Sequence, residues 1–72
     1  MDIQRLVAMA NDIAAFFDAE TDKVVATEGV RLHISRYWEA RMRREIIAHV
    51  NAGGAGLAPT AANAIRLLKA PT

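Results

Sequence analysis

Apolar side chains recur at spacings of three and four along the N-terminal part of the sequence, and this pattern restricts the fold more than any other feature. The pattern runs through Ile3, Leu6, Val7, Ala10, Ile13, Ala14 and Phe17. Such spacing places the side chains on one face of an α-helix, whereas the side chains of a half-buried strand alternate every second residue. Asp2 precedes the pattern and is a residue type that caps helix N-termini. The sequence therefore predicts a helix over residues 2–18.

Two further apolar patterns predict two more helices. The acidic connection 18–22 ends the first helix, and Thr21 or Asp22 can cap the second. In the second segment, expected over residues 22–38, the residues that share one face are Ala26, Val30, Ile34, Tyr37 and Trp38. A new stripe over residues 39–51 consists of Met42, Ile46, Ile47 and Val50. We expect the backbone to break near Trp38, between the second and third helices.

A glycine-rich turn follows the third predicted helix. The glycines of residues 53–56 favour a helix end, because glycine adopts left-handed backbone angles without strain. A phosphate-binding loop would need a Gly-Lys-Ser/Thr ending or a preceding strand, and the sequence predicts neither. Pro59 fits the first turn of a last helix over residues 59–69. The prediction is an all-α fold, a small bundle of three to four short helices in a single helical domain over residues 1–72.

The chain is short for a self-sufficient core. A domain of 72 residues leaves about 40% of its unfolded surface exposed after folding. The absence of cysteine excludes disulfides, thiolate zinc sites and cysteine-ligated iron–sulfur clusters. A partner chain is the remaining means of stabilisation. The net charge of +1 hides an asymmetry, because six acidic and two basic residues precede Gly29, and seven basic and two acidic residues follow it.

We expect no catalytic, cofactor-binding or metal-binding site. The two imidazoles, His33 and His49, lack the three- or four-residue spacing of paired metal ligands on a helix. Ser35 lies in no sequence frame that would activate it as a nucleophile. The chain by itself is therefore not expected to be an enzyme. No apolar run approaches the ~20 residues that span a membrane, so we expect a cytoplasmic protein without a membrane partner.

The stretch 36–44 holds the only Trp, the only Tyr and a cluster of arginines. These three residue types are enriched at interface hot spots. In addition, Phe16 widens the apolar face of the first helix beyond what one neighbouring helix covers. We predict a partner-binding surface made of Arg36, Tyr37, Trp38, Arg41, Met42, Arg43, Arg44 and Phe16. The alternative stays open, in which the Tyr-Trp pair belongs to the core and the charged residues form a solvated face.

Three blocks of the sequence carry a resemblance to a known family. They are residues 9–17 (MANDIAAFF), 33–43 (HISRYWEARMR) and 49–57 (HVNAGGAGL). In this order, with the Trp-Glu-x-Arg-Met-Arg run ahead of the glycine-rich turn, they resemble the delta subunit of the cytoplasmic, NAD-dependent, molybdenum-containing formate dehydrogenases, the FdsD family. Ala40 and Tyr37 depart from the family pattern, in which Pro and Phe are frequent at these positions. Pro in place of Ala40 would have fixed the start of the third helix.

The resemblance implies a non-catalytic accessory subunit without a cofactor of its own. The larger subunits of such a complex would carry bis-molybdopterin guanine dinucleotide, iron–sulfur clusters and FMN, and would convert formate and NAD to CO2 and NADH. The implied partner is a larger formate dehydrogenase subunit, above all the catalytic alpha subunit. The implied role is support of assembly, stability or cofactor loading of that subunit.

Two alternatives come from other classes of protein. A small helical nucleic-acid binder would place Arg36, Arg41, Arg43 and Arg44 on phosphates. The near-neutral net charge and the lack of a recognisable helix-turn-helix turn speak against it, so no nucleic-acid partner is expected. A self-associating helical module would instead use the broad apolar face of the first helix.

Overall fold

Each of the four predicted helices is present in the computed structural model, which describes residues 2–70. The helices are α1 (Ile3–Phe17), α2 (Lys23–Tyr37), α3 (Ala40–Asn51) and α4 (Pro59–Arg66). The described residues contain no strand, and the predicted all-α fold of short helices is confirmed. The first three helices begin one residue later than predicted, and α4 ends at Arg66 rather than at 69. The two ends of the predicted domain, residue 1 and residues 71–72, lie outside the described part.

Aspartates cap the first two helices. The Asp2 carboxylate accepts a hydrogen bond from the backbone N–H of Gln4 at 3.0 Å, and Asp22 accepts one from that of Val24 at 3.0 Å. Each bond satisfies one of the N–H groups that have no partner within the first turn of a helix. The Asp2 cap was predicted, and of the two candidates for the second cap the structure uses Asp22.

The backbone breaks at Trp38, between α2 and α3. Trp38 adopts extended angles (φ −87°, ψ 138°), and its backbone N–H still donates to the carbonyl of Ile34 at 3.1 Å. The break turns the Trp38 ring into the core, where only 6% of the residue is exposed. Tyr37, predicted on the same buried face, is instead 71% exposed, and that part of the prediction is wrong. One residue of extended backbone is enough to send neighbouring side chains to opposite sides.

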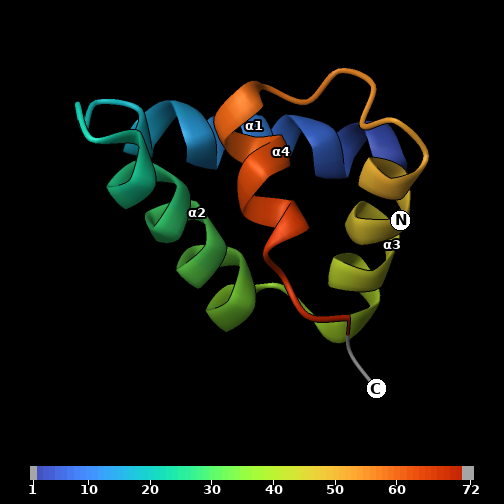
Figure 1. Cartoon of the computed structure of the whole chain (residues 1–72). Helices are drawn as coiled ribbons and strands as arrows, with labels where there is room; N and C mark the ends of the chain where they lie inside the picture. Colours follow the sequence, from blue (N-terminus) through green and yellow to red (C-terminus); the bar gives the residue numbers. More distant parts are fainter. Residues whose placement is uncertain (1, 71–72) are drawn as a thin grey trace.

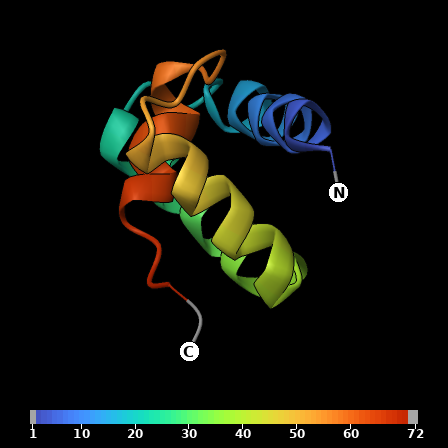
Figure 2. The ribbon, with the colours of Figure 1, turned by 90° about the vertical axis from the view of Figure 1, so that its right-hand side faces the viewer.

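The core lies where α4 packs against the other three helices. In Figure 1, α4 lies between α2 and α3, and α1 passes behind its N-terminal end. Figure 2 shows α3 on the side of α4 that faces away from α2. Each helix contributes two or three buried side chains to one cluster, together with Trp38: Leu6, Ala10, Ala14, Val30, Ile34, Ile46, Val50, Ala61, Ala64 and Ile65. Many of these are alanines, so the helices approach closely but bury little apolar volume.

The contact between α1 and α2 depends on Gly29. A Cβ atom at this position would lie 2.4 Å from Cδ1 of the Phe17 ring, far inside van der Waals contact. The ring therefore rests directly on the backbone of α2. Gly in a helix costs about 1 kcal/mol relative to Ala, and here that cost allows the close approach.

The glycine-rich turn ends α3, as predicted. Gly53, Gly54 and Gly56 all have positive φ, and the backbone N–H of Gly54 donates to the carbonyl of His49 at 2.9 Å. The side chain of Asn11 on α1 forms two hydrogen bonds with the backbone of this turn and of the residue that caps α4. Its Nδ2 donates to the carbonyl of Gly56 at 2.9 Å, and its Oδ1 accepts from the N–H of Ala58 at 2.8 Å. Asn11 thus binds the N-cap residue of α4, Ala58, which lies 47 residues further along the chain.

A second polar contact joins the C-terminal end of α1 to α4. The buried hydroxyl of Thr60 donates to the Asp18 carboxylate at 2.7 Å, and the ammonium of Lys23 lies 3.4 Å from the same oxygen. The hydrogen bond from Thr60, aided by Lys23, holds the pKa of the Asp18 carboxyl below its usual value. The charged form of Asp18 is therefore favoured in the folded chain.

This pKa shift predicts an acid-dependent loss of stability. A lowered pKa in the folded state contributes stability above the ordinary carboxyl pKa, and that contribution is lost as the pH falls through the lowered value. Wild-type chain should therefore lose more free energy of unfolding than Asp18→Asn between about pH 6 and about pH 3. Urea titrations at a series of pH values measure this difference. The same loss in both chains would contradict the assignment.

Candidate functional site

The structure divides the predicted docking stretch 36–44 between the core and the surface. Trp38 is buried, and Met42 and Arg43 are half-buried. Met42 packs against the core cluster. The residues of the stretch that are exposed are Arg36, Tyr37, Glu39, Arg41 and Arg44. The stretch therefore does not present one continuous face.

Arg43 has a role inside the chain. Its Nη1 donates to the backbone carbonyl of Ser35 at 2.9 Å, across the corner between α2 and α3. That carbonyl belongs to the last turn of α2, where helix carbonyls lack intrahelical partners and a positive charge is favourable. Because Trp38 and Arg43 both hold this corner together, we place neither of them on the candidate surface.

Tyr37 and Phe16 are the two exposed aromatic residues among those predicted to bind a partner. The Tyr37 ring packs against His33, one turn earlier on α2, with ring centroids 4.9 Å apart. Phe16 is 75% exposed and meets the Phe17 ring edge to face, with centroids 5.1 Å apart. An edge-to-face contact with one neighbour leaves most of the Phe16 ring in water.

Further exposed apolar side chains continue this surface along α2. Val24 is 78% exposed, and Val25 and Leu32 are also exposed. They lie outside the buried stripe of Ala26, Val30 and Ile34, so α2 carries exposed apolar residues, interspersed with polar ones, on its outer side as well.

Two grooves meet at Phe17 between α1 and α2, and together we call them the α1–α2 furrow. The first has a volume of about 370 Å³ and is lined by Asp12, Ile13, Phe16, Phe17 and His33. The second has a volume of about 560 Å³ and is lined by Phe17, Glu20, Val24, Val25, Glu28, Gly29 and Leu32. Because the Phe17 ring rests on Gly29, it forms the common wall of both grooves.

All charged residues that line the α1–α2 furrow are acidic. Asp12 has no hydrogen bond or ion pair from its carboxylate to any other residue in the range 2–70. Within the same range, the Glu20 carboxylate accepts only the backbone N–H of Asp22, at 3.1 Å, while the Lys23 ammonium donates to the Glu20 backbone carbonyl at 3.3 Å. Glu28 is paired with the guanidinium of Arg31, whose hydrogen bonds hold the pKa of the carboxyl below its usual value. The furrow is thus apolar at its base and negative at its rim.

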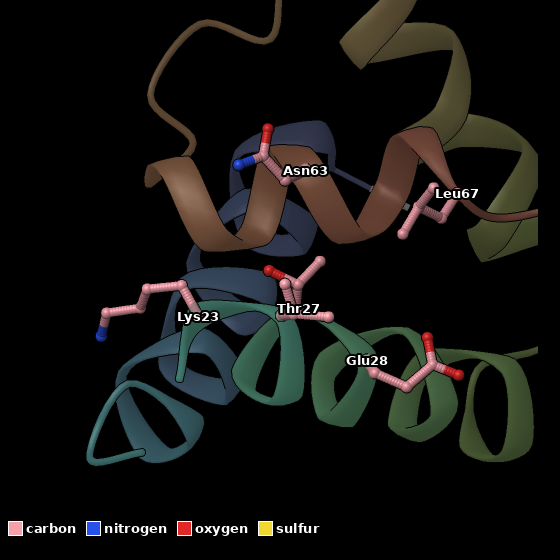
Figure 3. A pocket seen from close by; sticks show the side chains of 6 residues that line it. Lys23, Thr27, Glu28, Asn63 and Leu67 are labelled. Atoms are coloured by element: carbon pink, nitrogen blue, oxygen red, sulfur yellow. The ribbon is translucent and has the colours of Figure 1, made fainter. Parts of the chain in front are cut away.

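A third groove lies on the other side of α2, against α4. It has a volume of about 420 Å³. Figure 3 shows Thr27 of α2 and Leu67, just beyond α4, on facing sides of the space, with Lys23 and Glu28 toward its two ends. This groove mixes hydroxyl, amide and both signs of charge, and the exposed aromatic residues do not reach it.

Neither a metal site nor a membrane-spanning helix is found among the described residues. Within residues 2–70, no group of three or more His, Cys, Asp or Glu side chains lies close enough together to hold a metal ion. The helices of the same range are too short and too polar for any of them to cross a bilayer. His49 instead contacts the glycine-rich turn, with Nε2 2.8 Å from the carbonyl of Ala55.

Most residues of the furrow were absent from the sequence-predicted surface. Phe16 was included, but Val24, Val25 and Leu32 were not. Their exposure could have been predicted from the sequence, because helical periodicity places them on the side of the second helix opposite its buried stripe. The contact of Phe17 with Gly29 had no comparable signal, since it depends on how two helices cross.

Comparison with known protein families shows what the chain is similar to. A family model described as NADH-dependent formate dehydrogenase delta subunit FdsD matches residues 5–65, which is most of the chain. No curated protein and no solved structure matches the chain. The matched range covers α1 from Arg5 onward, all of α2 and α3, and α4 up to Ile65, and so includes the whole α1–α2 furrow.

The different positions of the arginines predict different effects of their removal. Arg43→Ala should lower the free energy of unfolding of the isolated chain by about 1–3 kcal/mol, because it removes a charged donor from the end of α2. Arg41→Ala and Arg44→Ala, both at exposed positions, should change it by less than about 0.5 kcal/mol. Urea unfolding of the three variants measures these changes. If Arg43→Ala lowers the free energy of unfolding no more than Arg41→Ala and Arg44→Ala do, the contact of Arg43 with Ser35 contributes nothing to stability.

Proposed function

Because this chain belongs to the family of NADH-dependent formate dehydrogenase delta subunits, FdsD, we propose that it is a non-catalytic accessory subunit of such a complex. It binds a larger subunit and supports assembly, stability or cofactor loading of the enzyme. The observation that carries the proposal is the family match over residues 5–65. A delta subunit acts as part of a complex, so its surface is expected to fit another chain.

The exposed apolar residues agree with this role. Phe16 and Val24 are each at least three-quarters exposed, and Tyr37 is nearly so. Burial of a large apolar side chain contributes about 1.5–3 kcal/mol, so several of them together supply a substantial part of a binding free energy. In a chain of 72 residues with an alanine-rich core, such side chains are better used against a partner than left in water.

We propose further that the partner is the catalytic alpha subunit of a cytoplasmic, molybdenum-containing enzyme. In this proposal bis-molybdopterin guanine dinucleotide, iron–sulfur clusters and FMN belong to the larger subunits. The reaction, oxidation of formate with NAD, then takes place outside this chain. The chain contributes contacts rather than reacting groups.

Omission of this chain during expression of the complex tests the proposal. The larger subunits are produced with and without it, purified through a tag on the alpha subunit, and assayed for yield, molybdenum content and formate-dependent reduction of NAD. With the chain present, we expect it to co-purify with the alpha subunit. Without it, we expect a loss of active complex of at least about fivefold, the effect of losing ~1 kcal/mol or more of stabilisation.

Addition of the purified chain to complex made without it separates the possible roles. Recovery of activity indicates stabilisation of an assembled enzyme. Normal yield of subunits with low molybdenum content, not restored by the addition, indicates a role in cofactor loading. Full yield, full molybdenum content and full activity without the chain would contradict the proposed function.

A further inference from the structure

We infer that the α1–α2 furrow is the docking site for one amphipathic helix of a larger subunit, with Lys or Arg residues beside its apolar face. This inference rests on the proposed function, which requires a partner subunit but does not say where it binds. The predicted docking stretch 36–44 is not the centre of this surface, because Trp38 and Arg43 are used inside the chain. The furrow lies on the acidic half of the chain instead.

The apolar base of the furrow favours a partner over solvent. Phe16 and Phe17 form one edge-to-face pair, of which Phe17 rests on Gly29 while Phe16 remains 75% exposed. On the facing helix, Val25 and Leu32 are exposed beside the same Phe17 ring. An aromatic ring beside exposed aliphatic side chains provides a hydrophobic groove of the kind that receives the apolar face of an amphipathic helix.

The length of the furrow fits a short helix. Along α2 it extends from Val24 to His33, ten residues whose nine steps of about 1.5 Å correspond to about 14 Å. A partner helix of two to three turns spans this distance. Its anchoring side chains would recur at spacings of three and four, since these lie on one helix face.

The charges around the furrow select a basic partner. Asp12 lines one groove and Glu20 the other, and neither carboxylate is paired with a cation within residues 2–70. Glu28 already has Arg31 as its partner. Lys or Arg residues at the two ends of the docked helix would therefore meet unpaired carboxylates. These opposite charges favour binding of a basic helix along the furrow and speed association.

A second copy of this chain fits the furrow less well. Its basic helix, α3, exposes Arg41, Arg44 and Ala48 on one side. This face offers the right charge but no large apolar side chain to fill the space beside Phe16 and Val25. Its larger apolar residues, Ile46 and Val50, are buried in its own core. The partner helix therefore comes from another subunit.

Photo-cross-linking within the complex identifies the occupant directly. A benzoylphenylalanine residue replaces Phe16 in the chain expressed together with the larger subunits, and in a second sample it replaces Leu67. Leu67 is a matched control, because it is 58% exposed but lies on the other side of α2. We expect the label at position 16 to react with one helical segment of a larger subunit that carries Lys or Arg beside apolar residues. A cross-link to a second copy of this chain, or reaction only from position 67, would overturn the inference.

Substitutions measure the contribution of the furrow to binding. A tagged chain with both Phe16→Ser and Val25→Ser should recover larger subunits at least about tenfold less efficiently than wild type, as expected when hot-spot contacts are lost. Leu67→Ser is the apolar control. Charge reversal by Asp12→Lys with Glu20→Lys should also reduce recovery, and more strongly at low salt, whereas Glu39→Lys on another face should not. Circular dichroism of each purified variant checks that the helices are retained.

The outcomes distinguish this inference from the proposed function. If wild-type chain recovers no formate dehydrogenase subunit, the proposed function is wrong, and the inference fails with it. If wild type and the furrow variants recover the subunits equally well, the chain binds through another face and only the inference is wrong. Loss of recovery in the furrow variants, with intact helix content and unaffected controls, supports both.

Discussion

The contact between the Phe17 ring and the backbone of Gly29 determines how the first two helices meet. With a side chain at position 29, a Cβ atom would lie 2.4 Å from the ring, so the ring or the helices would have to shift. Phe17 in this position is the common wall of two grooves, and the exposed Phe16 meets it edge to face. The fold and the candidate binding surface therefore depend on one close approach.

Part of the apolar surface of α2 remains outside the core. The buried stripe of α2 faces the core, and its other large apolar residues lie on the opposite side of the helix. Those residues, Val24, Val25 and Leu32, face outward beside acidic side chains. The basic second half of the chain is used differently, since Arg43 and Trp38 fix the corner between α2 and α3. Acidic residues of the chain thus lie beside an exposed surface, whereas Arg43 of the basic half makes an internal contact at the corner between α2 and α3.

Periodicity was sufficient to predict the helices, because the apolar stripe of each one is local. The caps at Asp2 and Asp22 and the glycine-rich end of α3 follow from local rules as well. The surface was less predictable. Trp and Arg are common both at interfaces and at buried corners, and residue type alone does not distinguish the two. Contacts such as Asn11 with Gly56 join residues far apart in the sequence and have no local signal.

A structure of the assembled enzyme, determined by electron cryo-microscopy with this chain bound, shows directly whether the α1–α2 furrow binds a helix of a larger subunit. The quantity to compare is the exposure of Phe16, which is 75% in the chain alone. We expect Phe16 to become buried under a helix of a larger subunit whose Lys or Arg residues lie near Asp12 and Glu20. A bound chain with Phe16 still in solvent, attached through α3 instead, would contradict this expectation.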